Sequence, residues 1–228
     1  MFDKKYLIVT STKYISEIIE KKKSLKKYFF IINKKKNLTL KNLGKIKPKY
    51  IFFPHWRHKI GKKIFKKYPC IGFHSTPLPY GRGGSPIQNM IIRGFKKTKI
   101  CAIQITENID AGPIYFKKVM SLKGDGETIM YRMNSTILKM IQIFLKNKIY
   151  PKKQIGKVTF FKRRKAKQSK IFFNNSLSKI YDQIRMLDID GYPKAYFENK
   201  KYKVTFRSAN FVGNKIKCSA LIEKQSIR

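Results

Sequence analysis

Residues 50–74, which read YIFFPHWRHKIGKKIFKKYPCIGFH, decide the fold of this chain. The apolar run Tyr50–Phe53 stops at a proline, and a second apolar run, Cys70–Phe73, follows it. Between the two, residues 59–67 carry apolar side chains at the spacing of one helix face. A strand, a helix and another buried strand in this order predict two neighbouring strands of a parallel sheet.

The same alternation extends toward the N-terminus. Apolar runs at Tyr6–Thr10 and Tyr28–Ile32 have strand length, and the segments after them, Tyr14–Lys22 and Leu38–Leu43, have helical character. We therefore predict an α/β fold built on a doubly wound, mostly parallel sheet.

Beyond His74 the pattern changes. Residues 76–86 hold three prolines and three glycines, which predicts a loop. The elements expected after it are helices at 87–93, 127–146 and 177–187, and strands at 100–106, 114–119, 158–161, 195–197 and 202–206. This pattern divides the chain into a main domain at 1–150 and a small mixed α/β appendage at 151–228, for specificity or dimerisation.

The composition is strongly basic. The 228 residues carry a formal net charge of +41, and lysines recur along nearly the whole chain. So basic a surface attracts polyanions such as tRNA. Uniform lysine enrichment is also what nucleotide bias in a genome produces, and both interpretations stay open.

Composition also excludes several classes of protein. The three cysteines, Cys70, Cys101 and Cys218, form no C-x-x-C pair, so we expect buried reduced thiols and neither a disulfide nor a metal site. No uncharged apolar run reaches the length of about 18 residues that crosses a bilayer. The N-terminus lacks the features of a signal peptide, so we expect a cytoplasmic protein.

Two polar residues follow predicted strands. His74 comes directly after the strand at 70–73, and Asp110 lies in a turn after the strand at 100–106. Because ligands of doubly wound sheets bind outside the carboxyl ends of the strands, we expect both side chains at one edge of the sheet. There the carboxylate would fix the tautomer of the imidazole and favour its protonated form, which makes an acid–base pair.

The stretch around His74 resembles the formyltransferase family, whose members read N-x-H-x-S-x-L-P, then R-G-x-x-P, with a later D-x-G turn. The matching positions here are His74, Leu78-Pro79, Arg82-Gly83, Pro86, and Asp110 with Gly112. The resemblance implies a Rossmann-like fold, N10-formyltetrahydrofolate as formyl donor and a primary amine as acceptor. It also implies that His74 stabilises the developing oxyanion and moves a proton to the leaving nitrogen. Asp110 would orient His74 and take the proton of the amine.

The resemblance assigns the surrounding loops as well. Residues expected to line the folate pocket are Pro54, His55, Trp56, Arg82, Gly83, Asn108, Ile109 and Asp110. Residues expected to contact the acceptor are Ser75, Thr76, Pro77, Tyr80 and Asn89. Trp56 fits a place in the core equally well, and Arg82 fits a structural role in its loop.

One position departs from the family pattern. The catalytic asparagine of the family would fall at Gly72, which has no side chain to donate a hydrogen bond. Three explanations stay open. A neighbour such as Asn89 or Asn108 substitutes, His74 and backbone N–H groups suffice, or the chain is inactive.

The last expectation concerns the acceptor. The tail after Pro151 is shorter than the barrel domain that the tRNA enzymes of the family usually carry, and its segment Phe160–Lys165 resembles a basic segment of sugar-nucleotide formyltransferases. We therefore expect an amino-sugar nucleotide as acceptor, as in lipopolysaccharide O-antigen synthesis, and a homodimer. The alternatives are methionyl-tRNA as acceptor, and a non-catalytic basic RNA-binding protein on the same scaffold.

Overall fold

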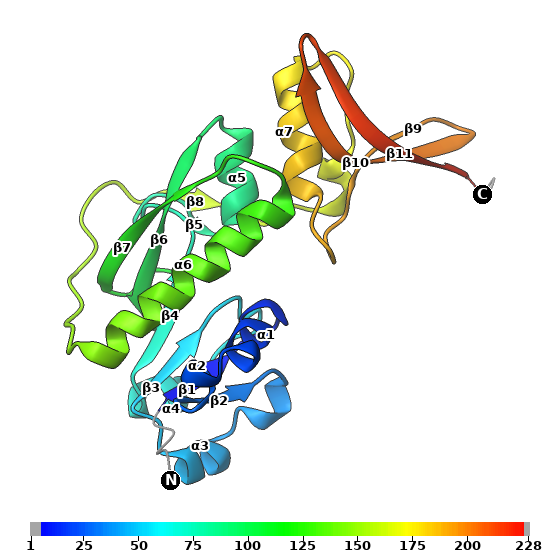
Figure 1. Cartoon of the computed structure of the whole chain (residues 1–228). Coiled ribbons are helices and arrows are strands. Elements are labelled where there is room, and N and C mark those ends of the chain that lie inside the picture. The colour runs from blue at the N-terminus through cyan, green and yellow to red at the C-terminus, as the bar shows by residue number, and fades with distance from the viewer. Residues whose placement is uncertain (1–5, 226–228) are drawn as a thin grey trace. The chain divides into compact units, whose positions relative to one another are not determined.

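The computed structural model describes residues 6–225 (Figure 1). The described chain forms two compact units that interleave along the sequence. The first unit comprises Met1–Arg82, Lys99–Val119 and Met133–Thr159, and the second comprises Gly83–Thr98, Met120–Arg132 and Phe160–Arg228, each as far as it is described. The division of the chain at residue 150 stays a prediction.

The central sheet has six strands in the order β2-β1-β3-β4-β6-β7. Their bounds are β1 (Tyr6–Val9), β2 (Phe29–Ile32), β3 (Tyr50–Phe53), β4 (Cys70–His74), β6 (Lys97–Gln104) and β7 (Ile114–Ser121). Strands β2, β1, β3 and β4 are parallel, whereas β6 runs antiparallel to β4, with His74 opposite Cys101 and Ile71 opposite Gln104. The predicted mostly parallel α/β sheet is confirmed. The sequence pattern did not predict that β6 runs antiparallel to β4.

Helices connect these strands. Their bounds are α1 (Tyr14–Lys21), α2 (Lys23–Lys26), α3 (Leu40–Ile46), α4 (Lys62–Lys67), α5 (Pro86–Ile92) and α6 (Gly126–Lys146), with a 3₁₀ turn η1 (Lys35–Asn37). Asp125 caps α6 by accepting a hydrogen bond of 2.7 Å from the Thr128 N–H, which satisfies a donor that the first helical turn leaves free. Helix α4 begins after Gly61, later than the predicted start at residue 59.

Apolar side chains cover both faces of the sheet in the first unit, as parallel strands require. The cluster on one face comprises Leu7, Val9, Ile32, Leu43, Ile51, Phe53, Ile64 and Cys70. Strand residues alternate between faces, so Tyr50 and Phe52 point to the other side. There Phe144 of α6 packs against them, with ring centroids 5.7 and 5.5 Å apart. Packing on both faces fixes β3 and β4, and thereby the start of the loops that follow them.

The second unit contains α7 (Leu177–Leu187) and an antiparallel sheet of order β11-β10-β9. Its strands are β9 (Ala195–Glu198), β10 (Tyr202–Val212) and β11 (Lys215–Lys224). A further two-stranded sheet pairs β5 (Arg82–Gly83) with β8 (Phe160–Phe161), and a 3₁₀ turn η2 (Ala166–Ser169) follows β8. The predicted mixed α/β tail is present, and β11 is a strand that the sequence analysis missed.

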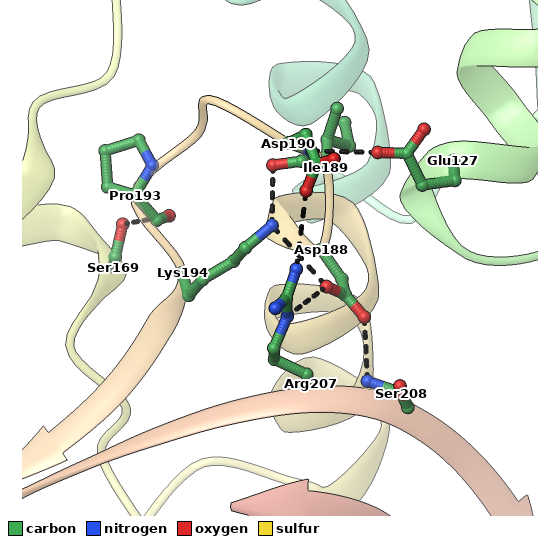
Figure 2. Close-up of polar contacts among 9 residues, drawn as sticks. All are labelled: Glu127, Ser169, Asp188, Ile189, Asp190, Pro193, Lys194, Arg207 and Ser208. Carbon is green, nitrogen blue, oxygen red and sulfur yellow. Dashed lines mark hydrogen bonds and ion pairs between the residues drawn. The ribbon is translucent and has the colours of Figure 1, made fainter. Parts of the chain in front are cut away.

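Asp188 fixes the loop after α7 to β10 (Figure 2). Its Oδ1 lies 3.2 Å from Nε of Arg207 and 3.5 Å from Nζ of Lys194, and its Oδ2 accepts a hydrogen bond of 2.7 Å from the Ser208 N–H. Burial opposes ionisation of this carboxyl, but the Ser208 N–H and the two cations outweigh it and hold the pKa of Asp188 below its usual range. Ser208 has a left-handed φ of 53°, at the irregularity of β10. The carboxylate therefore holds a backbone bend in place.

The cysteines only partly match the expectation. Cys70 and Cys101 are buried, and burial raises the pKa of the first thiol to about 12 and that of the second to about 11. Cys218 is exposed, so the expectation of a buried thiol is wrong there, because it lies on the edge strand β11. Across residues 6–225, no helix is both long and apolar enough to cross a membrane, and no three His, Cys, Asp or Glu side chains gather to hold a metal ion.

Candidate active site

His74 and Asp110 lie next to each other in the first unit. Nδ1 of His74 is 3.4 Å from Oδ2 of Asp110. His74 is the last residue of β4 and is almost fully buried, whereas the side chain of Asp110 is 20% exposed. The structure therefore brings the two predicted residues together, with the carboxylate as the more accessible member.

The two residues meet by a different route from the one expected. Because β6 is antiparallel to β4, its carboxyl end lies beside Ile71 and not beside His74. The turn between β6 and β7 therefore returns along the sheet, and within it Asp110 adopts a left-handed φ of 53°. Such a conformation costs a residue other than glycine about 1 kcal/mol and persists only where surrounding contacts enforce it.

The second ring nitrogen of His74 is also engaged. Nε2 lies 2.8 Å from the carbonyl oxygen of Gly81, which can only accept, so Nε2 carries a proton. The hydroxyl of Thr76 donates to the same oxygen over 3.2 Å. With Nε2 protonated, Nδ1 is the ring atom that can gain or release a proton, and it faces Asp110. The arrangement can thus pass a proton between imidazole and carboxylate.

Contacts from two other segments fix the turn that carries Asp110. A Cβ at Gly112 would lie 1.8 Å from the carbonyl oxygen of Gln104, so only glycine fits there. Nε2 of Gln154 donates to the carbonyl oxygens of Asp110 (2.9 Å) and Gly112 (2.8 Å), and its Oε1 accepts from Nη2 of Arg82 (2.8 Å). No motif in the sequence marks Gln154, which lies in a basic loop.

The loop after β3 begins at the same edge of the sheet as His74, because β3 and β4 are parallel. In this loop His55 has a left-handed φ of 53°, and its Nε2 lies 2.9 Å from Oδ1 of Asn134 on α6. Burial lowers the pKa of His55 to about 4, so its ring is neutral near pH 7 and donates through Nε2.

Trp56 carries an unsatisfied donor. Its indole N–H is buried and has no acceptor in the part of the chain that the structure describes. Its ring packs against Phe53, with centroids 6.4 Å apart, and edge-on against His58 at 4.9 Å. Pro54 beside them is buried. A buried donor without a partner in a loop at this edge suits a ligand with acceptor atoms.

Two of the residues expected to contact the acceptor are engaged inside the protein. The hydroxyl of Ser75 donates to Sδ of Met133 over 3.0 Å, and Thr76 is fully buried. Pro77 and Tyr80, in the same loop, are half-buried. On the Asp110 turn, Asn108 and Ile109 are exposed, so this turn offers both polar and apolar contacts to a ligand.

Asn89 and Gly83 belong to the second unit. Nδ2 of Asn89 lies 3.0–3.1 Å from the carbonyl oxygens of Gly84, Ser85 and Lys162, and its Oδ1 accepts from Nη1 of Arg93. These bonds use both amide protons, so this conformation leaves Asn89 no donor to replace the family asparagine. Gly83 has φ 103°, and a Cβ there would lie 2.5 Å from the carbonyl oxygen of Phe161.

Gly72 lies on the same face of β4 as His74, two residues before it. A Cβ at this position would lie 3.4 Å from Cγ1 of Ile105 and 3.5 Å from Cγ1 of Ile103, which are ordinary contacts. Steric exclusion of a Cβ therefore does not explain the glycine.

Two family models match the chain. A family model described as formyl transferase matches residues 10–140, and one described as the C-terminal domain of methionyl-tRNA formyltransferase matches residues 166–223. The methionyl-tRNA formyltransferase of Thermodesulfovibrio yellowstonii is 31% identical over 154 residues, which cover 64% of this chain and 50% of that protein. The chain spans about half the length of the curated relatives it matches.

Solved structures give the same result. A methionyl-tRNA formyltransferase from Clostridium thermocellum is similar with a TM-score of 0.92 and 42% identity, over 96% of this chain and 99% of that one. A 4-N formyltransferase from Francisella tularensis covers 100% of both chains with a TM-score of 0.62, but at 18% identity this shows the shared fold alone.

Proposed function

The chain belongs to the formyl transferase family, and from this premise we propose that it transfers a formyl group from N10-formyltetrahydrofolate to the amine of methionyl-tRNA. The family predicted from the residues around His74 is confirmed. One observation above all supports this acceptor: residues 166–223 match the C-terminal domain of methionyl-tRNA formyltransferases. The 42% identity to one such enzyme over nearly the whole chain supports the same acceptor.

This acceptor differs from the one that the tail favours in the sequence analysis. The comparisons support the alternative, methionyl-tRNA, better than an amino-sugar nucleotide. The described part of the tail contains a helix and a three-stranded sheet that the C-terminal family model covers, and this match supports tRNA as the acceptor. The net charge of +41 fits a tRNA acceptor, because a basic surface attracts a polyanion. A homodimer and a cytoplasmic location stay predictions.

The residues of the first unit fit a bound folate. The loop from Pro54 to Trp56 and the exposed residues Asn108 and Ile109 would line its pocket, with the indole N–H of Trp56 as a donor for acceptor atoms. His55, neutral at physiological pH, offers hydrogen bonds without adding charge. When bound, N10-formyltetrahydrofolate supplies the electrophilic formyl carbon.

His74 and Asp110 divide the proton transfers. Asp110 is the more accessible of the two, so its carboxylate takes the proton that the attacking amine loses. His74 is held through Nε2 by Gly81, so its Nδ1, 3.4 Å from Asp110, receives the amine proton from that carboxylate and passes it to the leaving nitrogen, and the imidazole stabilises the oxyanion. Because Gly72 supplies no side-chain donor and the amide of Asn89 is engaged, this stabilisation falls to His74 with backbone N–H groups or to the exposed Asn108 on the Asp110 turn.

A formyl-transfer assay tests the proposal. Release of tetrahydrofolate is followed with charged initiator tRNA and, in parallel, with a panel of amino-sugar nucleotides. We expect turnover with the tRNA alone. Turnover with an amino sugar and none with tRNA would overturn the proposed acceptor, and tRNA binding without any turnover would favour the non-catalytic alternative.

A further inference from the structure

The loop between α6 and β8 contacts the backbone beside both members of the acid–base pair. Gln154 donates to the carbonyl oxygen of Asp110 itself (2.9 Å). Thr159 acts on the other side: its Oγ1 accepts from the Gly81 N–H over 2.7 Å. The carbonyl oxygen of Gly81 is in turn the acceptor for Nε2 of His74 (2.8 Å). Both contacts come from a stretch of six residues within the first unit.

We propose that residues 154–159 act as a brace that sets the contact between His74 Nδ1 and Asp110 Oδ2, with Gln154 and Thr159 as positioning residues. This inference rests on the proposed formyl transfer. The same short stretch binds the backbone of Asp110 and the backbone of Gly81, which holds His74. The positions of Asp110 and His74 therefore depend on one loop and not on two.

The hydrogen-bonding groups of Gln154 show why glutamine is needed. Its NH₂ group bridges two carbonyl oxygens, those of Asp110 and Gly112, which would face each other without a donor if it were removed. Its oxygen faces a guanidinium, that of Arg82, which can only donate. No other side chain of this length supplies an acceptor on one branch and two donors on the other.

The brace also accounts for the backbone of Asp110. A left-handed φ at a residue other than glycine relaxes unless the surroundings hold it, and Gln154 binds the carbonyl of that residue. A displacement of about 1 Å in an active site can cost about a hundredfold in rate. Loss of the brace should therefore lower kcat more than it changes KM.

Two substitutions at residue 154 separate the two halves of its hydrogen bonding. Q154E keeps an acceptor for Arg82 but loses both donors to the turn, whereas Q154M keeps the shape and loses both halves. If positioning of Asp110 matters, both variants lose kcat by about ten- to a hundredfold with KM within about threefold of wild type. Q142E, on the part of α6 that lines a groove with Tyr6 and Tyr28, is the matched control for the added charge.

Thr159 provides an independent test with its own rescue. T159V removes the acceptor for the Gly81 N–H and should lower kcat about tenfold, while T159S keeps a hydroxyl and should recover most of that loss. Hydrogen exchange reports the same displacement without any substrate. The Gln104 amide, bonded to the carbonyl of Pro113 over 2.8 Å beside the turn, should exchange faster in Q154E, and the Gly81 amide should exchange faster in T159V.

Three results would overturn the brace: kcat of Q154E within threefold of wild type, a loss in Q142E as large as in Q154E, or failure of T159S to recover activity. Wild-type protein that transfers no formyl group to any acceptor would refute the proposed function instead. Hydrogen exchange would then still test the brace. Unchanged exchange of the Gln104 amide in Q154E and of the Gly81 amide in T159V would contradict it without any activity measurement.

Discussion

Asp110 has a left-handed φ, and Asp188, in the other unit, binds the N–H of a residue that has one, Ser208, but the two aspartates face different partners. Asp188 meets two cations and a backbone N–H, which tie the loop after α7 to β10. Asp110 faces the imidazole of His74, the kind of side chain that most often serves as general acid or base. The donors around Asp188 make it a structural anchor, whereas the imidazole makes Asp110 part of the proposed chemistry. Variants at the two positions should therefore separate stability from catalysis.

The largest effect is expected from D110N. The amide keeps the size of the carboxylate but cannot take a proton from the amine, so kcat should fall about a thousandfold, or about 4 kcal/mol. D188N should leave kcat within about threefold. The measurement is steady-state formyl transfer by both variants. A kcat for D110N within threefold of wild type would show that Asp110, like Asp188, is not needed for catalysis.

D188N should show the opposite behaviour in stability. Hydrogen bonds to charged groups contribute about 1.5–3 kcal/mol, and the amide loses its pairing with Arg207 and Lys194, so the free energy of unfolding should drop by about 2 kcal/mol. The pKa of Asp188 is depressed in the folded protein, so this stabilisation is complete above about pH 4, the usual value, and is lost as pH falls further. Denaturant melts at pH 7 and pH 3 check this. An equal difference between wild type and D188N at both pH values would contradict it.

His55 adds a pH dependence of its own to the unit that contains Asp110. Its folded pKa of about 4 lies below the usual value of about 6.5, so between these values the unfolded chain binds the extra proton. Stability is therefore lost as pH falls from about 6.5 to 4, by about 1–2 kcal/mol at pH 5. H55Q keeps a donor for Asn134 and cannot be protonated, so its unfolding free energy should be flatter over this window. The same slope in H55Q and wild type would assign the effect to other groups.

The contrast between the aspartates also shows what the sequence could and could not predict. Strands β1 to β4 are short apolar runs, so the local sequence locates them, and the family motif together with the expected strand ends picked out His74 and Asp110. The direction of β6 depends on pairing across the sheet, which no local pattern records. Gln154 acts on Asp110 from 44 residues away through backbone carbonyls, and such contacts leave no signature in residue type.

The smallest effect concerns Gly72, which lies on the face of β4 that carries His74. An asparagine there would place its Cβ at 3.4 Å from Ile105, so G72N should fold with a loss of less than about 1.5 kcal/mol. Removing one oxyanion donor from a site built for it costs about a hundred- to a thousandfold. Adding one to a site that works without it should gain much less, so we expect kcat to rise by about tenfold or less. A fall in kcat with unchanged stability would mean that the space beside Gly72 is used by a reacting group, and that His74 and the backbone already form the complete oxyanion site.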